Sequence, residues 1–136
     1  MIYITRKERF NAAHRVFRPD WTDEKNLQIF GKCSNPNWHG HNYDLFVTIK
    51  GEVNPETGYL IDLKVLSSLI REKIVNKIDH SNINLDVDFM QGQIATTENL
   101  AMSVWKELDD GIKLLGAELH CIKLYESENN VVEYFG

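Results

Sequence analysis

A stretch of alternating side chains between residues 41 and 52 constrains the fold of this chain more than any other feature. From residue 43 onward every second side chain is apolar, and this period of two predicts a β-strand with one buried face. The apolar set is Tyr43, Leu45, Val47 and Ile49. His39 and His41 extend the same odd-numbered series, so an extended backbone places both imidazoles on that face. Two imidazoles arranged in this way are able to hold one metal ion.

A third histidine is needed for a catalytic zinc site, which usually takes three protein ligands and leaves one position for water or substrate. The remaining histidines are His14, His80 and His120. His14 has the most suitable surroundings, because it shares its parity with Phe10 and Ala12 in a predicted first strand. The small side chains of Ala12 and Ala13 leave room for an ion. The spacing of the histidines also fits solvated or hydrogen-bonded side chains without a metal.

The composition fits one domain spanning residues 1–136, because a chain of 136 residues with 43% hydrophobic side chains is long enough to bury a core. A net charge of -5 argues against a general nucleic-acid-binding protein. The sequence shows neither an apolar run long enough to span a membrane nor the pattern of a secretory signal, so we expect a cytoplasmic protein without a membrane partner. In a reducing compartment the two cysteines, Cys33 and Cys121, remain free thiols.

The order of the expected elements predicts an α+β fold. Asp62 is the expected N-cap of a first helix, and Thr96 or Thr97 that of a second. The strands are expected at residues 2–14, 41–52, 119–126 and 131–135, and the helices at residues 63–78 and 97–115. This order predicts an antiparallel four-stranded sheet with both helices on one face. Residues 16–30 are expected to form a packed loop, and the exposed sheet edges favour an oligomer.

Several motifs separated along the chain carry a resemblance to a known enzyme family. The motifs are Phe10–Arg15, Gly31–Tyr43, Leu85–Val87, Thr96–Asn99 and Tyr125–Glu126, with Asp79–His80 after the first helix. Together they resemble the 6-pyruvoyl-tetrahydropterin synthase family, which includes 6-carboxytetrahydropterin synthases, over nearly the whole chain. The resemblance implies the tunnelling fold, in which three subunits close their sheets into a barrel and two trimers stack into a homohexamer with sites at subunit interfaces. It also implies that His14, His39 and His41 bind zinc.

The activity implied by the resemblance is that of a zinc-dependent lyase of tetrahydrobiopterin biosynthesis. Such an enzyme converts a small-molecule substrate, 7,8-dihydroneopterin triphosphate, to 6-pyruvoyl-tetrahydropterin and triphosphate without a redox cofactor. Zinc held by three neutral imidazoles polarises substrate oxygens, which eases the removal of a neighbouring proton. Cys33 is the implied general base, and His80 is able to form its thiolate when Asp79 orients the imidazole. The implied catalytic residues are therefore Cys33, Asp79 and His80.

The substrate-binding residues implied by the resemblance lie in the second half of the chain. Glu126 interrupts an apolar strand face, and its carboxylate is able to accept two adjacent N–H groups of a pterin ring. Thr96, Thr97 and Glu98 stand at a helix start, where free backbone N–H groups are available to a ligand. The same residues also fit a simpler interpretation, in which Glu126 faces solvent and the threonines only cap the helix.

The sequence leaves other interpretations of the site residues open. Cys33 could be the fourth ligand of a closed structural zinc site, and Asp79 and His80 could simply be charges at a helix C-terminus. Basic side chains near the histidines are candidates for contacts to the triphosphate, but they also fit a solvated surface. They are Arg15, Arg18, Lys25 and Lys32. We assign no role to His120 or Cys121.

The function has alternatives within and outside this family. Residues 34–38 form a five-residue spacer between Cys33 and His39, as in the pyruvoyl enzymes, whereas the 6-carboxytetrahydropterin synthases of the queuosine pathway typically have a shorter one. This spacing favours the pyruvoyl product. A noncatalytic pterin- or zinc-binding module predicts binding without turnover. A zinc hydrolase predicts the incorporation of water instead of a rearranged side chain.

Overall fold

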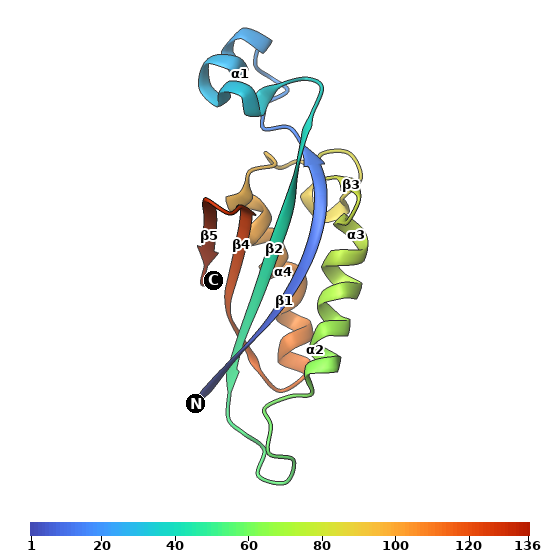
Figure 1. Ribbon diagram of the computed structural model, residues 1–136, viewed down its shortest axis with the longest axis vertical. Helices are drawn as coiled ribbons and strands as arrows, with labels where there is room; N and C mark the ends of the chain where they lie inside the picture. Colours follow the sequence, from blue (N-terminus) through green and yellow to red (C-terminus); the bar gives the residue numbers. More distant parts are fainter.

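The computed structural model describes residues 1–136 and contains one five-stranded sheet. The strands are β1 (Ile2–His14), β2 (His39–Gly51), β3 (Ser81–Asn82), β4 (Glu118–Ser127) and β5 (Asn130–Tyr134). Their spatial order is β3-β1-β2-β4-β5, and all neighbours are antiparallel except β3, which runs parallel to β1. The long strands β1 and β2 form a twisted pair along the long axis of the molecule (Figure 1).

Helices cover one face of the sheet. α2 (Leu63–Ile70) continues through a π-helical segment, Arg71–Val75, into α3 (Asn76–Ile78). α4 (Thr97–Leu114) packs against β4 and α2, and a 3₁₀ turn at Asp88–Met90 precedes it. α1 (Asp23–Phe30) and the 3₁₀ segment Gly31–Ser34 instead project beyond the sheet, at the end where β1 stops and β2 begins (Figure 1). None of the helices combines the length and the apolar character needed to cross a lipid bilayer.

The alternating pattern of β2 determines where the core lies. The side chains of Tyr43, Leu45, Val47 and Ile49 are at most 1% exposed and face the helices, as the sequence predicts. The buried helix residues opposite them are Leu66, Ile70, Ile74, Ile78, Leu100, Val104, Leu108 and Ile112. Burial of each large aliphatic side chain contributes roughly 1.5–3 kcal/mol, so a slip of one residue in β2 would be costly. The core therefore fixes the face on which the odd-numbered histidines lie.

The predicted helix starts are confirmed. The Asp62 side chain accepts a hydrogen bond from the backbone N–H of Lys64 and caps α2. The Thr96 hydroxyl accepts one from the backbone N–H of Asn99 and caps α4, so Thr97 is the first helical residue. Thr96 and Thr97 thus stand at the end of the sheet that carries the histidines.

Two parts of the fold prediction were wrong. The sheet is not a purely antiparallel four-stranded one, because β3 adds a fifth, parallel strand beside Ala12 and Ala13. Two residues are too few to carry an alternating pattern, so only the tertiary structure reveals this pairing. The second error concerns residues 16–30, in which α1 forms after the N-cap Thr22. α1 buries only Asn26 and has no apolar stripe, so its sequence resembles that of a loop.

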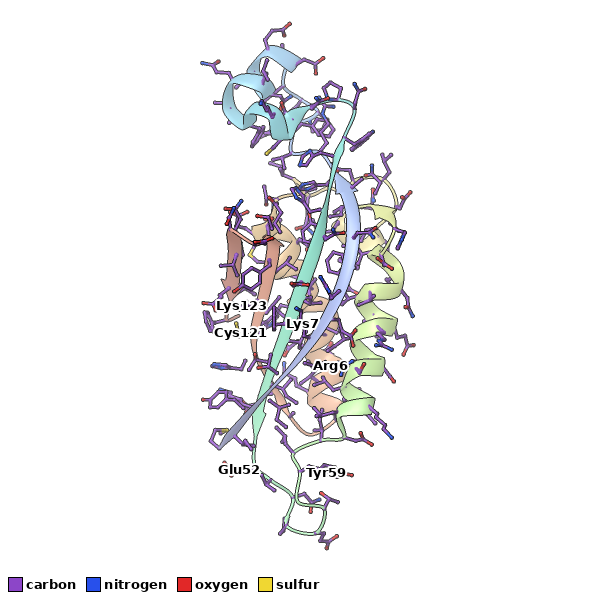
Figure 2. All side chains as sticks on the ribbon, viewed as in Figure 1. Arg6, Lys7, Glu52, Tyr59, Cys121 and Lys123 are labelled. Atoms are coloured by element: carbon purple, nitrogen blue, oxygen red, sulfur yellow. The ribbon has the colours of Figure 1, made fainter.

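Glu8 joins β1 to the helix layer from the buried face of the strand. Its carboxylate accepts hydrogen bonds from Ser67 Oγ at 2.7 Å, Arg6 Nε at 3.0 Å and Arg71 Nε at 3.3 Å. Burial by itself raises the pKa of Glu8, but the three donors outweigh it and hold this pKa below its usual range. The neighbouring Lys7 (labelled in Figure 2) projects from the opposite face of β1, where it pairs with Asp44.

Replacing Glu8 with glutamine is expected to lower the free energy of unfolding by about 1–3 kcal/mol at neutral pH, because a charged acceptor of several hydrogen bonds is lost. A folded-state pKa below the unfolded value gives stability that is fully present above the unfolded pKa and is lost as the pH falls through the folded-state pKa. The difference between wild type and Glu8→Gln should therefore shrink below about pH 4. Urea unfolding at both pH values measures it.

The exposed Glu118, which pairs with Lys50 at 3.3 Å, offers a matched control. Because an exposed ion pair contributes little, Glu118→Gln should change the free energy of unfolding by less than about 1 kcal/mol at either pH. A Glu8→Gln effect that stays constant on acidification would contradict the prediction.

Candidate active site

Three histidines meet where β1 ends and β2 begins. The strand register pairs His14 with His39 and Ala12 with His41, so all three imidazoles lie on the helix-covered face. Their ring centroids are 4.5–5.1 Å apart. One nitrogen of each ring belongs to a group of possible ligand atoms that lie within 4.8 Å of one another. The three histidines predicted as ligands are thus brought together.

The free nitrogens of these rings show that the group fits a metal ion. His14 Nε2, His39 Nδ1 and His41 Nε2 are buried and have no hydrogen-bond partner. His14 Nδ1 lies 2.8 Å from the carbonyl oxygen of Ala95, and donation to that oxygen leaves Nε2 with a free lone pair. Burial lowers the pKa values of His14 and His39, and the neighbouring imidazoles lower them further. Neutral imidazoles with free nitrogens are the form that binds divalent transition metals.

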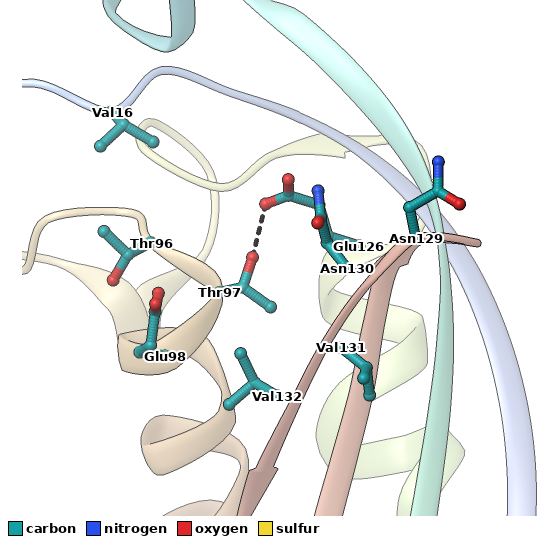
Figure 3. A pocket seen from close by; sticks show the side chains of 9 residues that line it. All are labelled: Val16, Thr96, Thr97, Glu98, Glu126, Asn129, Asn130, Val131 and Val132. Atoms are coloured by element: carbon teal, nitrogen blue, oxygen red, sulfur yellow. Dashed lines mark hydrogen bonds between the residues drawn. The ribbon is translucent and has the colours of Figure 1, made fainter. Parts of the chain in front are cut away.

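A cavity of about 470 Å³ lies next to Glu126 (Figure 3). Its lining residues are Val16, Thr96, Thr97, Glu98, Glu126, Asn129, Asn130, Val131 and Val132. Glu126 Oε2 accepts a hydrogen bond of 2.5 Å from the Thr97 hydroxyl, and Oε1 lies 3.7 Å from His41 Nε2. The four predicted substrate-binding residues therefore line one cavity, and Glu126 connects that cavity to the histidine cluster.

Sequence reasoning missed part of the wall of this cavity. Asn129 lies in the β4–β5 turn and Asn130 begins β5, and Figure 3 shows both beside Glu126. The sequence marks them only as turn residues, because asparagine favours turns whether or not it contacts a ligand. It also gave no sign that the Ala95 carbonyl orients His14.

Cys33 lies in the 3₁₀ segment that follows α1, and its thiol is free and exposed. Its backbone carbonyl accepts a hydrogen bond of 2.8 Å from the Val16 N–H. The thiol does not belong to the group of possible metal ligands, which contains the three histidines alone. This geometry does not support the closed site with Cys33 as a fourth ligand.

Asp79 and His80 form a pair that is anchored to β1. His80 Nδ1 lies 3.0 Å from Asp79 Oδ2, while Asp79 Oδ1 accepts a hydrogen bond from the backbone N–H of Asn11 at 2.9 Å. This backbone hydrogen bond and the neighbouring His80 hold the pKa of Asp79 below its usual range. His80 has φ of 59°, a left-handed conformation that is uncommon for residues other than glycine. Its exposed imidazole is thus oriented by the carboxylate but lies apart from the three-histidine cluster.

The distance along β1 separates this pair from Cys33. The backbone of Cys33 is bonded to Val16, and the backbone N–H of His80 donates to the Asn11 carbonyl at 2.7 Å. Val16 lies beyond the end of β1 and Asn11 lies within it, five residues earlier in the chain. The Cys33 thiol makes no hydrogen bond to either member of the pair. Within one chain the three predicted catalytic residues therefore do not meet.

The family model described as 6-pyruvoyl tetrahydropterin synthase matches residues 3–136 of the chain. The chain belongs to this family. It is 41% identical over 133 residues to the 6-pyruvoyl tetrahydrobiopterin synthase of Pongo abelii, which covers 98% of this chain and 90% of that protein. The solved structure of 6-pyruvoyl tetrahydropterin synthase from Caenorhabditis elegans aligns with a TM-score of 0.92 at 32% identity, over 99% of this chain and 95% of that one.

A second branch of the 6-pyruvoyl tetrahydropterin synthase family is more distant. The 6-carboxy-5,6,7,8-tetrahydropterin synthase of Bacillus subtilis is 27% identical over 101 residues, which cover 72% of this chain and 65% of that protein. The resemblance found in the motifs is thus confirmed over nearly the full length, and the similarity is higher to proteins named as pyruvoyl enzymes.

The basic residues near the site are mostly engaged elsewhere. Arg18 makes two hydrogen bonds to Asp20, and Lys25 lies 4.2 Å from the centre of the Trp21 ring. Arg15 donates to the Ser34 carbonyl at 2.7 Å and stacks on a neighbouring aromatic ring. None of these cations lines the cavity beside Glu126.

Proposed function

We propose that this protein is a zinc-dependent lyase that converts 7,8-dihydroneopterin triphosphate to 6-pyruvoyl-tetrahydropterin and triphosphate. The observation that carries the proposal is the placement of three unpaired histidine nitrogens beside a cavity walled by Glu126 and Thr97. The names of the relatives at about 40% identity support the pyruvoyl product. The more distant relation to the 6-carboxy enzyme agrees with that choice.

The histidines and the cavity have separate tasks in this proposal. His14, His39 and His41 would hold zinc, which supplies Lewis-acid polarisation of oxygens on the substrate side chain. Glu126 accepts two adjacent N–H groups of the pterin ring, and the Thr97 hydroxyl holds its carboxylate in place. Because Glu126 lies 3.7 Å from His41, a pterin bound there presents its side chain to the histidine cluster.

Cys33 and His80 supply the proton transfers of the proposed mechanism. Asp79 accepts from Nδ1–H of His80, which leaves Nε2 free to take the proton of the Cys33 thiol. The thiolate then removes a proton from the substrate side chain. Because Cys33 does not meet the Asp79–His80 pair within one chain, we propose that the pair at each site comes from a second copy of the protein.

An oligomer with sites at subunit interfaces is therefore part of the proposal. We propose a homohexamer built as a dimer of trimers, in which the sheet edges at β3 and β5 pair with neighbouring copies. The proposed partners are this small-molecule substrate and further copies of the chain, with neither nucleic acid nor membrane. The proposed location is the cytoplasm, where the free thiols of Cys33 and Cys121 stay reduced.

Anaerobic incubation of the zinc-loaded protein with 7,8-dihydroneopterin triphosphate is expected to release triphosphate and yield 6-pyruvoyl-tetrahydropterin, identified by mass. Protein stripped of metal by a chelator should release little triphosphate, because the substrate oxygens are then not polarised. A 6-carboxy product with acetaldehyde would assign the protein to the other branch. Binding without turnover would replace the enzyme by a noncatalytic module, and incorporation of water without rearrangement would indicate a hydrolase.

A further inference from the structure

Tyr43 carries a buried hydroxyl group that has no hydrogen-bond partner. The residue is 1% exposed and lies on β2, two positions after His41. Its sequence pattern predicts only a core side chain, for which phenylalanine would serve equally well. Buried polar groups in folded proteins are almost always hydrogen-bonded. An unpaired buried hydroxyl therefore indicates an acceptor that comes within hydrogen-bonding distance when a ligand binds or a side chain moves.

The residues that surround the Tyr43 ring exclude several possible hydrogen-bond acceptors for its hydroxyl. The Tyr43 ring stacks on Phe10 with centroids 4.9 Å apart, and it meets the edges of His41 at 5.7 Å and His14 at 6.4 Å. His14 uses Nδ1 for the carbonyl of Ala95, and the free nitrogens of both histidines belong to the candidate metal site. The aromatic neighbours therefore leave no acceptor for the hydroxyl.

Glu126 is the carboxylate expected across the sheet from Tyr43. The β2–β4 pairing ends with Asp44 opposite Tyr125, and continuing this register by one position would set Tyr43 opposite Glu126. The contacts of Glu126 with Thr97 and His41 place its carboxylate on the helix-covered face. Side chains in such positions have Cβ atoms about 4.5–5.5 Å apart.

One carboxylate oxygen of Glu126 is free to accept a hydrogen bond from the Tyr43 hydroxyl. Its Oε2 atom accepts from Thr97, whereas Oε1 has no hydrogen-bond donor, because His41 Nε2 at 3.7 Å is too distant. We infer that Tyr43 is a positioning residue for Glu126, whose hydroxyl donates to Oε1 when a pterin occupies the cavity. A carboxylate oxygen accepts two hydrogen bonds, so Oε1 is able to bind Tyr43 and a pterin N–H together. This inference rests on the proposed function.

A hydrogen bond from Tyr43 to Glu126 is expected to raise the affinity of the cavity for a pterin. A carboxylate held by Thr97 on one oxygen and by Tyr43 on the other has fewer orientations to lose when the ligand binds. Tyr43 is not expected to touch the reacting atoms, because its hydroxyl is buried and the residue does not line the cavity beside Glu126. Its loss should therefore raise KM and leave kcat nearly unchanged.

Tyr43→Phe is expected to weaken binding of 7,8-dihydroneopterin by about 5- to 20-fold, as measured by fluorescence titration of the zinc-loaded protein. Its free energy of unfolding without ligand should stay the same or rise, because the hydroxyl has no partner to lose. Tyr134→Phe is the matched control, since that residue lies on the edge strand β5, where it packs on Trp105 of α4. It should change neither affinity nor KM.

A double-mutant cycle with Glu126→Ala, which removes the acceptor, distinguishes positioning of the carboxylate from a general packing effect. If Tyr43 acts through Glu126, Tyr43→Phe should have little further effect on affinity in the Glu126→Ala background. Equal losses in both backgrounds, or an unchanged affinity of Tyr43→Phe in the wild-type background, would overturn the inference. A wild-type protein that does not bind 7,8-dihydroneopterin would instead overturn the proposed function, before any variant is compared.

Discussion

Replacing Cys33 with alanine is expected to lower kcat by about 10²–10⁴-fold, because a general base that removes a substrate proton contributes on this scale. The exposed position of the residue means that the substitution creates no cavity in the core. Pterin affinity and zinc content should stay close to the wild-type values, since Cys33 belongs neither to the histidine cluster nor to the cavity beside Glu126. Triphosphate release, a binding titration and metal analysis measure these three quantities.

Cys121→Ala provides the matched control for the loss of a thiol. Cys121 lies on β4 (Figure 2), and burial raises the pKa of its thiol, which disfavours the thiolate. The variant should turn over substrate at the wild-type rate. If Cys33→Ala loses its zinc along with its activity, the thiol is a metal ligand and the role of general base is wrong.

Two ligands of the candidate metal site could be predicted from the sequence because alternate residues of a β-strand lie on the same face of the sheet. His39 and His41 continue the odd-numbered face that Tyr43 and Leu45 bury, so their common face follows from the pattern alone. His14 required one more assumption, that its own strand would pair with β2 in a register that brings residues 14 and 39 together. The observed register does so. The odd or even position of a residue in a strand predicts the face on which its side chain lies. Only the folded sheet shows which residue of the neighbouring strand lies opposite it.

The parts that sequence reasoning missed depend on contacts between distant segments. β3 pairs with Ala12 because the chain leaves α3 beside β1, and nothing in Ser81 or Asn82 encodes that pairing. The separation of Cys33 from His80 likewise follows from their attachment to Val16 and Asn11, which no local pattern reveals. Asp79 and His80 were recognised as catalytic candidates, yet their distance from the thiol required the structure.

The same separation predicts how inactive variants should complement one another. Cys33→Ala lacks the proposed base, and His80→Asn lacks the group that takes its proton. Asparagine is chosen because φ at residue 80 is 59°, a conformation that asparagine tolerates, and because the exposed side chain packs against little. Each variant alone should therefore fold, assemble and show almost no turnover.

Mixed oligomers of these two variants should regain about one quarter of the wild-type activity when equal amounts are unfolded and refolded together. Random assortment gives about one quarter of the interfaces an intact Cys33 from one subunit and an intact His80 from its neighbour. Wild type mixed with the Cys33→Ala/His80→Asn double variant is the control. It should also give about one quarter, whereas a site formed within one chain would give about one half. No recovery in the first mixture, together with half in the second, would place both residues in one subunit and would contradict a site shared between two copies of the chain.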